Sequence, residues 1–351
     1  MLSDTVDAVI GVDTHRDTHS ASLVNAVGGE LATITVATNT EGYQQLLVWS
    51  HRYAPGTQIV WALEGSRSHG AGLLRFLRAE NQNIVEANRP KRARGQAGKS
   101  DPLDARRTAR ETLGNTRHAV PRADGPREAA RILLSTREGA VQARTAAINQ
   151  LKALICCAPD ELRARLRNKT NPVLIAACLQ LRPNATTDIE HHARLTALQR
   201  LARRIRDLAN EITAAEKELT ALARTYVAKL LEQTGIGLIT AIQAWISWSE
   251  PGRFRNEAAF ASLAGASPIP ASSGLTTRHR LNRYGDRDLN QALHHITITR
   301  ERCHPPTRDY VARRTAEGKT RKEIRRCLKR YLARQIFKIL ENNPPTQLDT
   351  T

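Results

Sequence analysis

The sequence predicts an α/β domain at its N-terminal end and an almost entirely helical remainder. Short apolar runs rich in β-branched residues recur within residues 7–87, as is typical of buried strands. From about residue 126, apolar residues recur instead at helical spacing for roughly a hundred residues. The chain has 351 residues, of which 40% are hydrophobic, so it can form two or three domains with their own cores.

The first part of the chain alternates between expected strands and helices. The strands are expected at residues 7–12, 20–24, 31–36, 58–63 and 83–87. Gly28 and Gly29 predict a hairpin turn between the second and third strands. Helices are expected at residues 40–53 and 70–79. Three strands joined by hairpins and then helix, strand, helix and strand is the element order of an RNase H-like domain.

A basic segment follows the fifth strand and leads into a further helix. Its Gly and Pro residues predict a loop, and its cations are Arg89, Lys91, Arg92, Arg94 and Lys99. These side chains are expected to contact nucleic-acid phosphates. Ser100 or Asp101 as N-cap and Pro102 in the first turn predict a helix that ends at about Leu113.

Two heptad series predict long helices in the middle of the chain. The cleaner series places Leu198, Ile205, Ile212 and Leu219 at one position and Leu201, Leu208, Ala215 and Leu222 at another. An earlier segment spaces Leu134, Val141, Ile148 and Ile155 by sevens. Apolar residues at both seam positions are typical of a coiled coil. We expect the two segments to pair as an antiparallel hairpin within a subunit, between subunits, or both; an ordinary helical bundle is the alternative.

The last third of the chain combines turn motifs, a loop and basic helices. Gly235-Ile236-Gly237 resembles a helix-hairpin-helix turn, whose free backbone N–H groups would bind phosphate; a plain helix–helix turn is the alternative. The loop 265–274 contains Ser272 and Ser273. Arg278, Arg280 and Arg283 follow it and are expected to bind nucleic acid. Helices are expected from about Arg287 and at residues 321–340, and Trp245 and Trp248 are expected in the core.

The charge distribution indicates a nucleic-acid partner. The chain carries 53 Lys and Arg against 34 Asp and Glu, and cations neutralise phosphates. Residues 1–80 hold 5 Lys or Arg and 8 Asp or Glu, whereas residues 278–338 hold 18 and 6. The positive charge is therefore regional, as a binding surface requires. No apolar run approaches the roughly 18 residues of a membrane span, and the five cysteines fit neither a zinc site nor a disulfide framework. We expect a cytoplasmic, nucleoid-associated protein.

Four carboxylates form the candidate catalytic site. Asp13 and Glu64 end two expected strands, and Asp101 and Asp104 share one helix face three residues apart. Two Mg²⁺ ions bound by such carboxylates would stabilise the attacking and leaving oxygens at a phosphodiester. Salt bridges to Arg106 or Arg107, or helix capping by Asp101, are the structural alternatives. His15 and His19, which lie near Asp13 in the sequence, could contact the metal ligands or a substrate. The favoured interpretation is that they are polar surface residues.

These motifs resemble one family of insertion-sequence transposases. The stretches GVDTHRDTH around Asp13, LEG around Glu64 and KSDPLDAR around Asp101 look like the DEDD motif of the one-hundred-and-ten type, which includes the Piv-like DNA invertases. Residues 234–237, 260–268 and 272–274 look like that family's C-terminal transposase domain. The resemblance covers nearly the whole chain, because the helical middle fits the family's coiled-coil linker.

The resemblance implies a fold, a chemistry and partners. It implies a RuvC-like catalytic domain at residues 1–120, a coiled-coil region at 121–226, a C-terminal transposase domain at 227–341 and a tail at 342–351. Asp13, Glu64, Asp101 and Asp104 would hold Mg²⁺, and Ser273, with Ser272 as fallback, would be the nucleophile. A structured guide RNA would direct the enzyme to element ends and target DNA, and the protein would assemble as a dimer or as a dimer of dimers.

Two other functions remain open from the sequence. A RuvC-like nuclease could use the same carboxylates with water as the nucleophile. A non-enzymatic, basic coiled-coil protein could bind nucleic acid without cutting it. The four acidic residues argue against the second, because without metal they would weaken phosphate binding.

Overall fold

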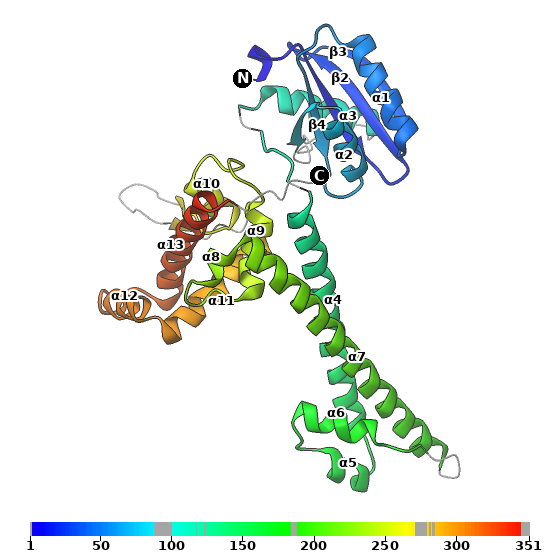
Figure 1. Cartoon of the computed structure of the whole chain (residues 1–351), viewed down its shortest axis with the longest axis vertical. Helices are drawn as coiled ribbons and strands as arrows, with labels where there is room; N and C mark the ends of the chain where they lie inside the picture. Colours follow the sequence, from blue (N-terminus) through cyan, green and yellow to red (C-terminus); the bar gives the residue numbers. More distant parts are fainter. Residues whose placement is uncertain are drawn as a thin grey trace. The chain divides into compact units, whose positions relative to one another are not determined.

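The structure is a computed structural model that describes residues 2–87, 100–116, 118–122, 124–183, 188–270, 279–280, 282 and 285–344. The chain divides into two compact units, Met1–Arg122 and Ala123–Thr351 (Figure 1). The first unit is a mixed α/β sheet domain and the second is mostly helical, which confirms the predicted fold at this level. Within the described ranges, no helix is long and apolar enough to cross a membrane.

A five-stranded sheet organises the first unit. The strands are β1 (Ala8–Thr14), β2 (Thr18–Asn25), β3 (Glu30–Ala37), β4 (Ile59–Glu64) and β5 (Asn83–Ala87). They lie in the order β3-β2-β1-β4-β5. The first three pair antiparallel, whereas β1, β4 and β5 pair parallel. The predicted strands are all confirmed, and Gly28, with φ +84°, lies in the predicted turn between β2 and β3.

Helices cover both faces of this sheet, and strand alternation decides which residues each helix meets. The helices are α1 (Thr40–Tyr53), α2 (Ala71–Ala79) and α3 (Asp101–Gly114), and a short 3-10 helix (Leu2–Asp4) precedes β1. Ile10 and Trp61 pack in the cluster that contains residues of α1 and α2. Val9 and Val60 pack with Ala109 of α3 on the other face. Because successive side chains on a strand point to opposite faces, odd residues of β1 and even residues of β4 face α3.

Gly11 allows α3 to lie close against β1. A Cβ atom at this position would lie 2.2 Å from the carbonyl oxygen of Ala105 and 2.5 Å from the backbone nitrogen of Ala109. Real Cβ atoms essentially never come that close to backbone atoms. Glycine at this position therefore fixes how near the helix that carries Asp101 and Asp104 comes to the sheet.

Two long antiparallel helices form the frame of the second unit. They are α4 (Pro126–Cys156) and α7 (Ile189–Tyr226). Leu134 shares a buried cluster with Leu219, and Leu151 shares another with Leu198, so the start of α4 meets the end of α7. Two short helices, α5 (Asp160–Leu166) and α6 (Asn171–Leu179), lie between them in the chain and pack at their far end (Figure 1). The sequence did not predict these two helices.

The heptad pattern describes α7 better than α4. Leu198, Ile205, Ile212 and Leu219 are buried as predicted, whereas Leu208 and Leu222 are half-buried. On α4 the buried residues include Ala140, Ala147 and Leu151, while Val141 and Ile148 are only half-buried. The heptad positions predicted for α4 are therefore partly wrong, because alanines next to them make part of the contact with α7. Pairing within one chain is confirmed; coiled-coil geometry and pairing between subunits stay predictions.

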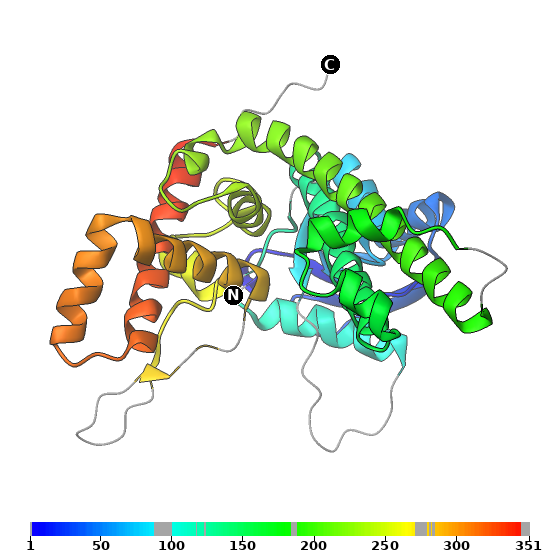
Figure 2. The ribbon, with the colours of Figure 1, turned by 90° about the horizontal axis from the view of Figure 1, so that it is seen from below.

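The rest of the second unit is a compact helical assembly. Its elements are α8 (Ala228–Leu231), α9 (Leu238–Trp248), α10 (Glu257–Leu263), β6 (Ile269–Pro270), β7 (His279–Arg280), α11 (Arg287–Cys303), α12 (Pro305–Ala316) and α13 (Arg321–Asn342). The helices α11, α12 and α13, orange to red in Figure 2, pack together. Trp245, Trp248 and Phe260 are buried in the core, as predicted for the two tryptophans. The sequence did not predict α12 or the β6–β7 pair.

A buried arginine ties the Gly235-Ile236-Gly237 turn to this assembly. Arg300 of α11 donates from Nε to the carbonyl oxygen of Thr234 (2.7 Å) and from Nη1 to Oε1 of Gln335 on α13 (2.9 Å). Gly235 has φ +82°, and its Cα lies against the Arg300 side chain. The turn is thus held from two helices that follow it in the chain.

Candidate active site

Asp13 and Glu64 lie side by side at the ends of two neighbouring parallel strands. The register pairs Val12 of β1 with Leu63 of β4, so Asp13 and Glu64 are the next pair along. Both lie on the face of the sheet that α3 covers, by the alternation described above. The Thr14 hydroxyl donates to the carbonyl oxygen of Glu64 (2.8 Å) and joins the two strand ends.

The first turn of α3 supplies the other two carboxylates. Asp101 is the first residue of the helix and Pro102 is the second, after the N-cap Ser100. Proline suits this position because its missing N–H needs no partner there. Asp104 lies one turn further and pairs with Arg107, with Oδ1 to Nη1 at 2.9 Å. This is one of the structural alternatives that the sequence allowed for Asp104.

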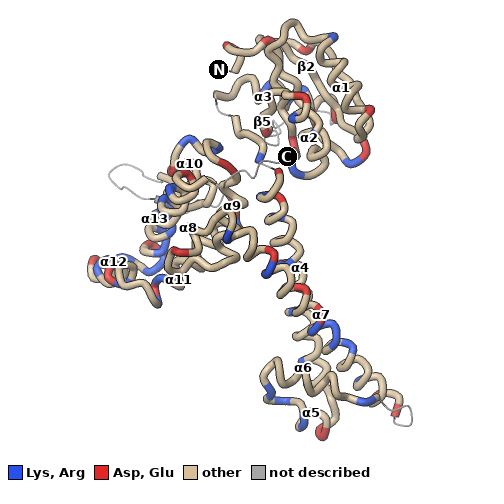
Figure 3. Tube along the Cα trace, in the orientation of Figure 1, with Lys and Arg blue, Asp and Glu red and all other residues tan. Residues whose placement is uncertain are grey.

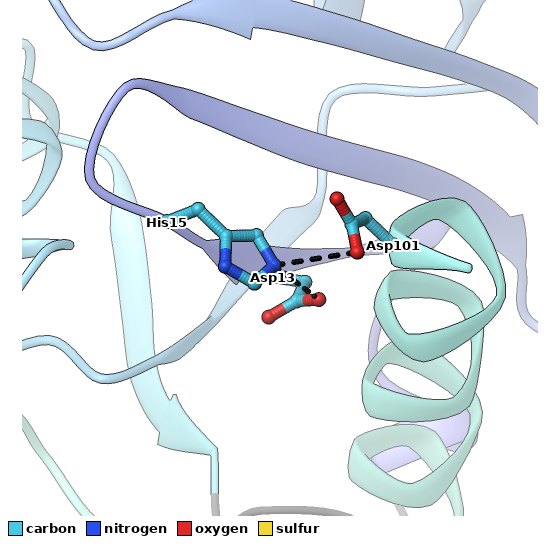
Figure 4. Close-up of side chains that lie close together, drawn as sticks. All are labelled: Asp13, His15 and Asp101. Atoms are coloured by element: carbon cyan, nitrogen blue, oxygen red, sulfur yellow. Dashed lines mark hydrogen bonds and ion pairs between the residues drawn. The ribbon is translucent and has the colours of Figure 1, made fainter. Parts of the chain in front are cut away.

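His15 connects the strand end to the helix start. Its Nε2 atom lies 3.2 Å from Oδ2 of Asp13 and 3.4 Å from Oδ1 of Asp101 (Figure 4). One ligand atom from each of these three residues falls within 4.8 Å of the others. Asp13 is 9% exposed, whereas the side chains of His15 and Asp101 are about half exposed. The cluster is therefore open to a substrate on one side and buried on the other.

Burial dominates the protonation chemistry of Asp13. Desolvation raises the pKa of its carboxyl group, and the negative charges of Asp101 and Asp104 raise it further. His15 opposes this by charge and by hydrogen bonding, both of which lower the pKa of Asp13. The net rise means that the folded protein bears a cost for holding this carboxylate ionised. A cation bound beside it would remove that cost.

The favoured surface interpretation does not hold for either histidine. His15 contacts two of the candidate carboxylates, which is the alternative that the sequence left open for it. Its position two residues after Asp13 at the end of a strand could have indicated this, since alternate residues share a face. His19 is fully buried in β2 and stacks on Tyr43 with ring centroids 5.8 Å apart. Burial lowers the pKa of His19.

The donor set fits a divalent cation. Ligands on opposite sides of one Mg²⁺ ion are about 4 Å apart, which is close to the 4.8 Å span of Asp13, His15 and Asp101. Two carboxylate oxygens suit Mg²⁺ or Mn²⁺, while an imidazole nitrogen favours the transition metals. The cluster would supply charge neutralisation for a phosphodiester and for the oxygens that attack and leave it.

The other candidate residues are distributed over the second unit and the basic loop. Gly235, Gly237 and Arg280 are described: Gly237 precedes α9, and Arg280 ends β7. The Gly237 N–H donates to Oγ1 of Thr240 (3.0 Å), so this amide is not free as the turn motif suggested. Ser272, Ser273, Arg278, Arg283 and the cations Arg89, Lys91, Arg92, Arg94 and Lys99 lie outside the described residues.

Comparison with known proteins assigns the chain to a family. A transposase model named for the DEDD transposases of IS110 matches residues 10–156, which include all four carboxylates. A model described as transposase IS116/IS110/IS902 family matches residues 227–312. The two matched segments make up well over half of the chain. The chain is a transposase of the IS110 family.

A full-length relative supports this assignment. The insertion element IS900 uncharacterized 42 kDa protein of Mycobacterium paratuberculosis is 24% identical over 381 aligned positions, which cover 95% of each chain. This IS110-family transposase is accordingly an enzyme that cuts and rejoins DNA. That activity excludes the non-enzymatic alternative. It also makes DNA the substrate and a divalent metal the expected cofactor.

Proposed function

We propose that the transposase is an RNase H-like enzyme in which Asp13, Glu64, Asp101 and Asp104 hold two Mg²⁺ ions and Ser273 attacks the DNA strand. The observation that supports this proposal is the cluster of Asp13, His15 and Asp101, where the end of β1 meets the start of α3. The strand register places Glu64, at the end of β4, next to Asp13. Bound Mg²⁺ would stabilise the negative charge that develops on the oxygens at the cleaved phosphodiester.

Several contacts of the chain itself support this assignment. Gly11 sets the approach of α3, and the Thr14 hydroxyl joins the ends of β1 and β4. His15 lies between Asp13 and Asp101, with its Nε2 atom 3.2 Å and 3.4 Å from one oxygen of each carboxylate. We assign His15 the role of orienting these carboxylates, because it contacts both and is itself half exposed. Such preorganisation of charged groups lowers the barrier of phosphoryl transfer.

A serine nucleophile accounts for rejoining without an energy source. The Ser273 hydroxyl oxygen would form a bond to phosphorus while the bond from phosphorus to one deoxyribose oxygen breaks. The serine proton would pass to the departing oxygen, which leaves as a hydroxyl group. A hydroxyl of another DNA end would then attack the phosphoserine and restore the serine. The phosphodiester is thus conserved, in keeping with the lack of a Gly-x-x-x-x-Gly-Lys-Ser/Thr nucleotide loop in the sequence.

Guide RNA and assembly complete the proposal. We propose that a structured RNA pairs with element ends and target DNA, and that carboxylates of one subunit act with the serine of another in a dimer or dimer of dimers. The basic character of residues 278–338 supports a nucleic-acid contact there. The scarcity of aromatic residues, 4% of the chain, supports base pairing by RNA as the main source of sequence recognition.

The carboxylate part of the proposal can be tested by strand cleavage. A DNA that carries the element ends is incubated with the protein, the RNA encoded beside the gene and Mg²⁺. We expect Asp13→Asn and Asp101→Asn to reduce cleavage by at least about 10³-fold, since each removes a charge at the metal site. Glu111→Gln is the matched control, because Glu111 is an exposed carboxylate further along the same helix. Full cleavage by Asp101→Asn would contradict the site.

The nucleophile is tested by trapping the covalent adduct. Denaturing gels should show a protein–DNA adduct with the wild type and none with Ser273→Ala. An adduct that survives Ser273→Ala and disappears with Ser272→Ala would move the nucleophile by one residue. Cleavage without any adduct in either variant would instead favour water as the nucleophile. Omission of the RNA should abolish site-specific cleavage; cleavage at the same site without it would refute guidance.

A further inference from the structure

A basic cavity opens on the second unit, away from the carboxylate cluster in sequence. It has a volume of about 590 Å³ and lies between the segment after α10, the end of α12 and the first half of α13. Its walls include Ala266, Ser267, Asn282, Ile324 and Tyr331. Figure 3 shows Lys and Arg residues along α13. Most of the lining belongs to the basic segment 278–338 proposed above to contact nucleic acid, and the cavity gives that contact a defined place.

The cavity carries a strong excess of positive charge. Of the described residues that line it, six are Lys or Arg and one is acidic; the cations are Arg280, Arg314, Lys319, Arg326, Lys329 and Arg330. Two of these are neutralised by carboxylates outside the lining, since Arg314 pairs with Glu317 and Arg330 pairs with Glu257. The one acidic lining residue, Glu323, accepts from Thr320 at the start of α13 and lies 4.0 Å from Arg326, an ion pair at the limit of contact.

Lys329 brings a half-buried positive charge to the cavity. Its Nζ donates to Oδ1 of Asn290 (2.9 Å), and no carboxylate in the described part of the chain is paired with it. Burial lowers the pKa of its ammonium group, which reports the cost of holding the charge there. A half-buried cation without a counter-charge is unfavourable. A phosphate that enters the cavity would offset that cost.

Tyr331 adds an aromatic face at the same cavity. It is 52% exposed, although tyrosine rings are usually more buried than this. Its ring is held edge-on against Tyr310, with centroids 5.8 Å apart and planes at 89°. A fixed, exposed ring beside cations matches the way proteins bind unpaired nucleic-acid strands, with phosphates on the cations and a base stacked on the ring.

We propose that this cavity binds a single-stranded segment of nucleic acid, with its phosphates against Lys319, Arg326 and Lys329 and one base against Tyr331. The inference rests on the proposed function in one respect, namely that the enzyme exposes unpaired strands while it exchanges them. A duplex would satisfy the cations but would keep its bases away from the tyrosine. DNA and RNA both carry the phosphodiester chain that the cations would bind, so either could be the single strand.

The test measures binding of short labelled probes to the full-length protein by fluorescence anisotropy in EDTA. The probes are a dT20 strand, a U20 strand and a 20-base-pair duplex. We expect Tyr331→Ala to weaken single-strand binding about tenfold and duplex binding far less, while Tyr331→Phe keeps wild-type affinity. Lys329→Gln should weaken binding and reduce the slope of log affinity against log salt by about one. The probe that is bound more tightly, dT20 or U20, identifies the source of the strand.

Matched controls separate this site from general effects. Tyr53→Ala removes an exposed ring in the first unit, and Lys152→Gln removes an exposed charge on α4, outside both the cavity and the basic segment 278–338. Both should bind as the wild type does. Wild-type single-strand affinity in Tyr331→Ala with an unchanged melting temperature would overturn the inference. So would an equal loss for single strand and duplex.

One further variant distinguishes the inference from the proposed function. Asp101→Asn should lose cleavage but bind dT20 and U20 as the wild type does. If Asp101→Asn still cleaves DNA while Tyr331→Ala loses strand binding, the carboxylate assignment fails and the cavity assignment stands. If Asp101→Asn loses cleavage and Tyr331→Ala binds normally, the reverse holds.

Discussion

Replacing Gly11 with alanine should damage the active site without touching any of its polar residues. The new Cβ would lie 2.2 Å from the Ala105 carbonyl oxygen, whereas ordinary contact begins near 3.4 Å. The Cβ would be fixed to the β1 backbone and the oxygen belongs to the α3 backbone, so neither can rotate away and α3 would have to move from β1 by about 1 Å. Overpacking of this kind costs about 1–3 kcal/mol.

The displacement reaches the chemistry through Asp101, the first residue of α3. Its Oδ1 lies 3.4 Å from His15 Nε2, and a further displacement of about 1 Å takes the pair beyond ion-pair range. A misplacement of about 1 Å at a reacting centre can reduce the rate about 10²-fold. We therefore expect Gly11→Ala to lose stability in the first unit and to cleave DNA about a hundred times more slowly.

Two measurements and one control check this reasoning. Hydrogen exchange of the full chain should show faster exchange in the peptides of β1 and α3 and no change in α9 or α13. Cleavage rates are measured on the same preparation. Gly114→Ala, at the end of the same helix, has nothing within 4 Å of its added Cβ and should be neutral or stabilising. Wild-type exchange and cleavage in Gly11→Ala would refute the role given to the close approach.

Three other variants probe charge and polar contacts. Without metal, the raised pKa of Asp13 makes its ionised form destabilising, by an amount that grows as pH rises above 3.8 and levels off above the folded-state pKa. In EDTA at pH 7, Asp13→Asn should therefore melt no lower than the wild type. Mg²⁺ should stabilise only the wild type. Glu301 is 5% exposed and accepts from Arg325 at 2.8 Å, so Glu301→Gln should cost about 2 kcal/mol in denaturation. Because the pKa of Glu301 is lowered, its stabilisation is present above about pH 4.5 and disappears as pH falls through the folded-state pKa, which a series of melts would show. Arg300→Met leaves the Thr234 carbonyl without its donor and should cost about 2 kcal/mol, measured by the melting temperature.

Local sequence signals predicted most of the first unit because the strands, turns and helix starts there are encoded by residues close together in the sequence. The β-branched run of β3, the Gly28 turn and the Pro102 helix start each depend on neighbours in sequence. The second unit was harder, since α5 and α6 have only seven and nine residues, and these two helices and α12 are held by packing against the helices on either side of them. Periodicity also favoured large side chains on α4, whereas Ala140 and Ala147 make part of its contact with α7.

The sequence predicted site residues best where a carboxylate stands at the expected end of a strand or start of a helix. Asp13 and Asp101 stood at a strand end and a helix start, and the fold brings both to one cluster. For His15 the sequence offers only its position two residues after Asp13. Its contact with Asp101 depends on how closely α3 packs against β1, where Gly11 lies. The pairing of Asp104 with Arg107 likewise follows from helix geometry.

The hydrophobic cluster at the far end of α4 and α7 has a mechanical consequence. At 1.5 Å per residue, the 31-residue α4 extends about 45 Å. An open hairpin of that length would unravel from its tip, where each helix has fewest neighbours. Leu162, Leu166 and Leu174 close that tip with a core that includes Ile155 and Leu195. The α4–α7 pair can therefore stay folded along its whole length, and the distance that it spans is fixed by the number of residues in its helices.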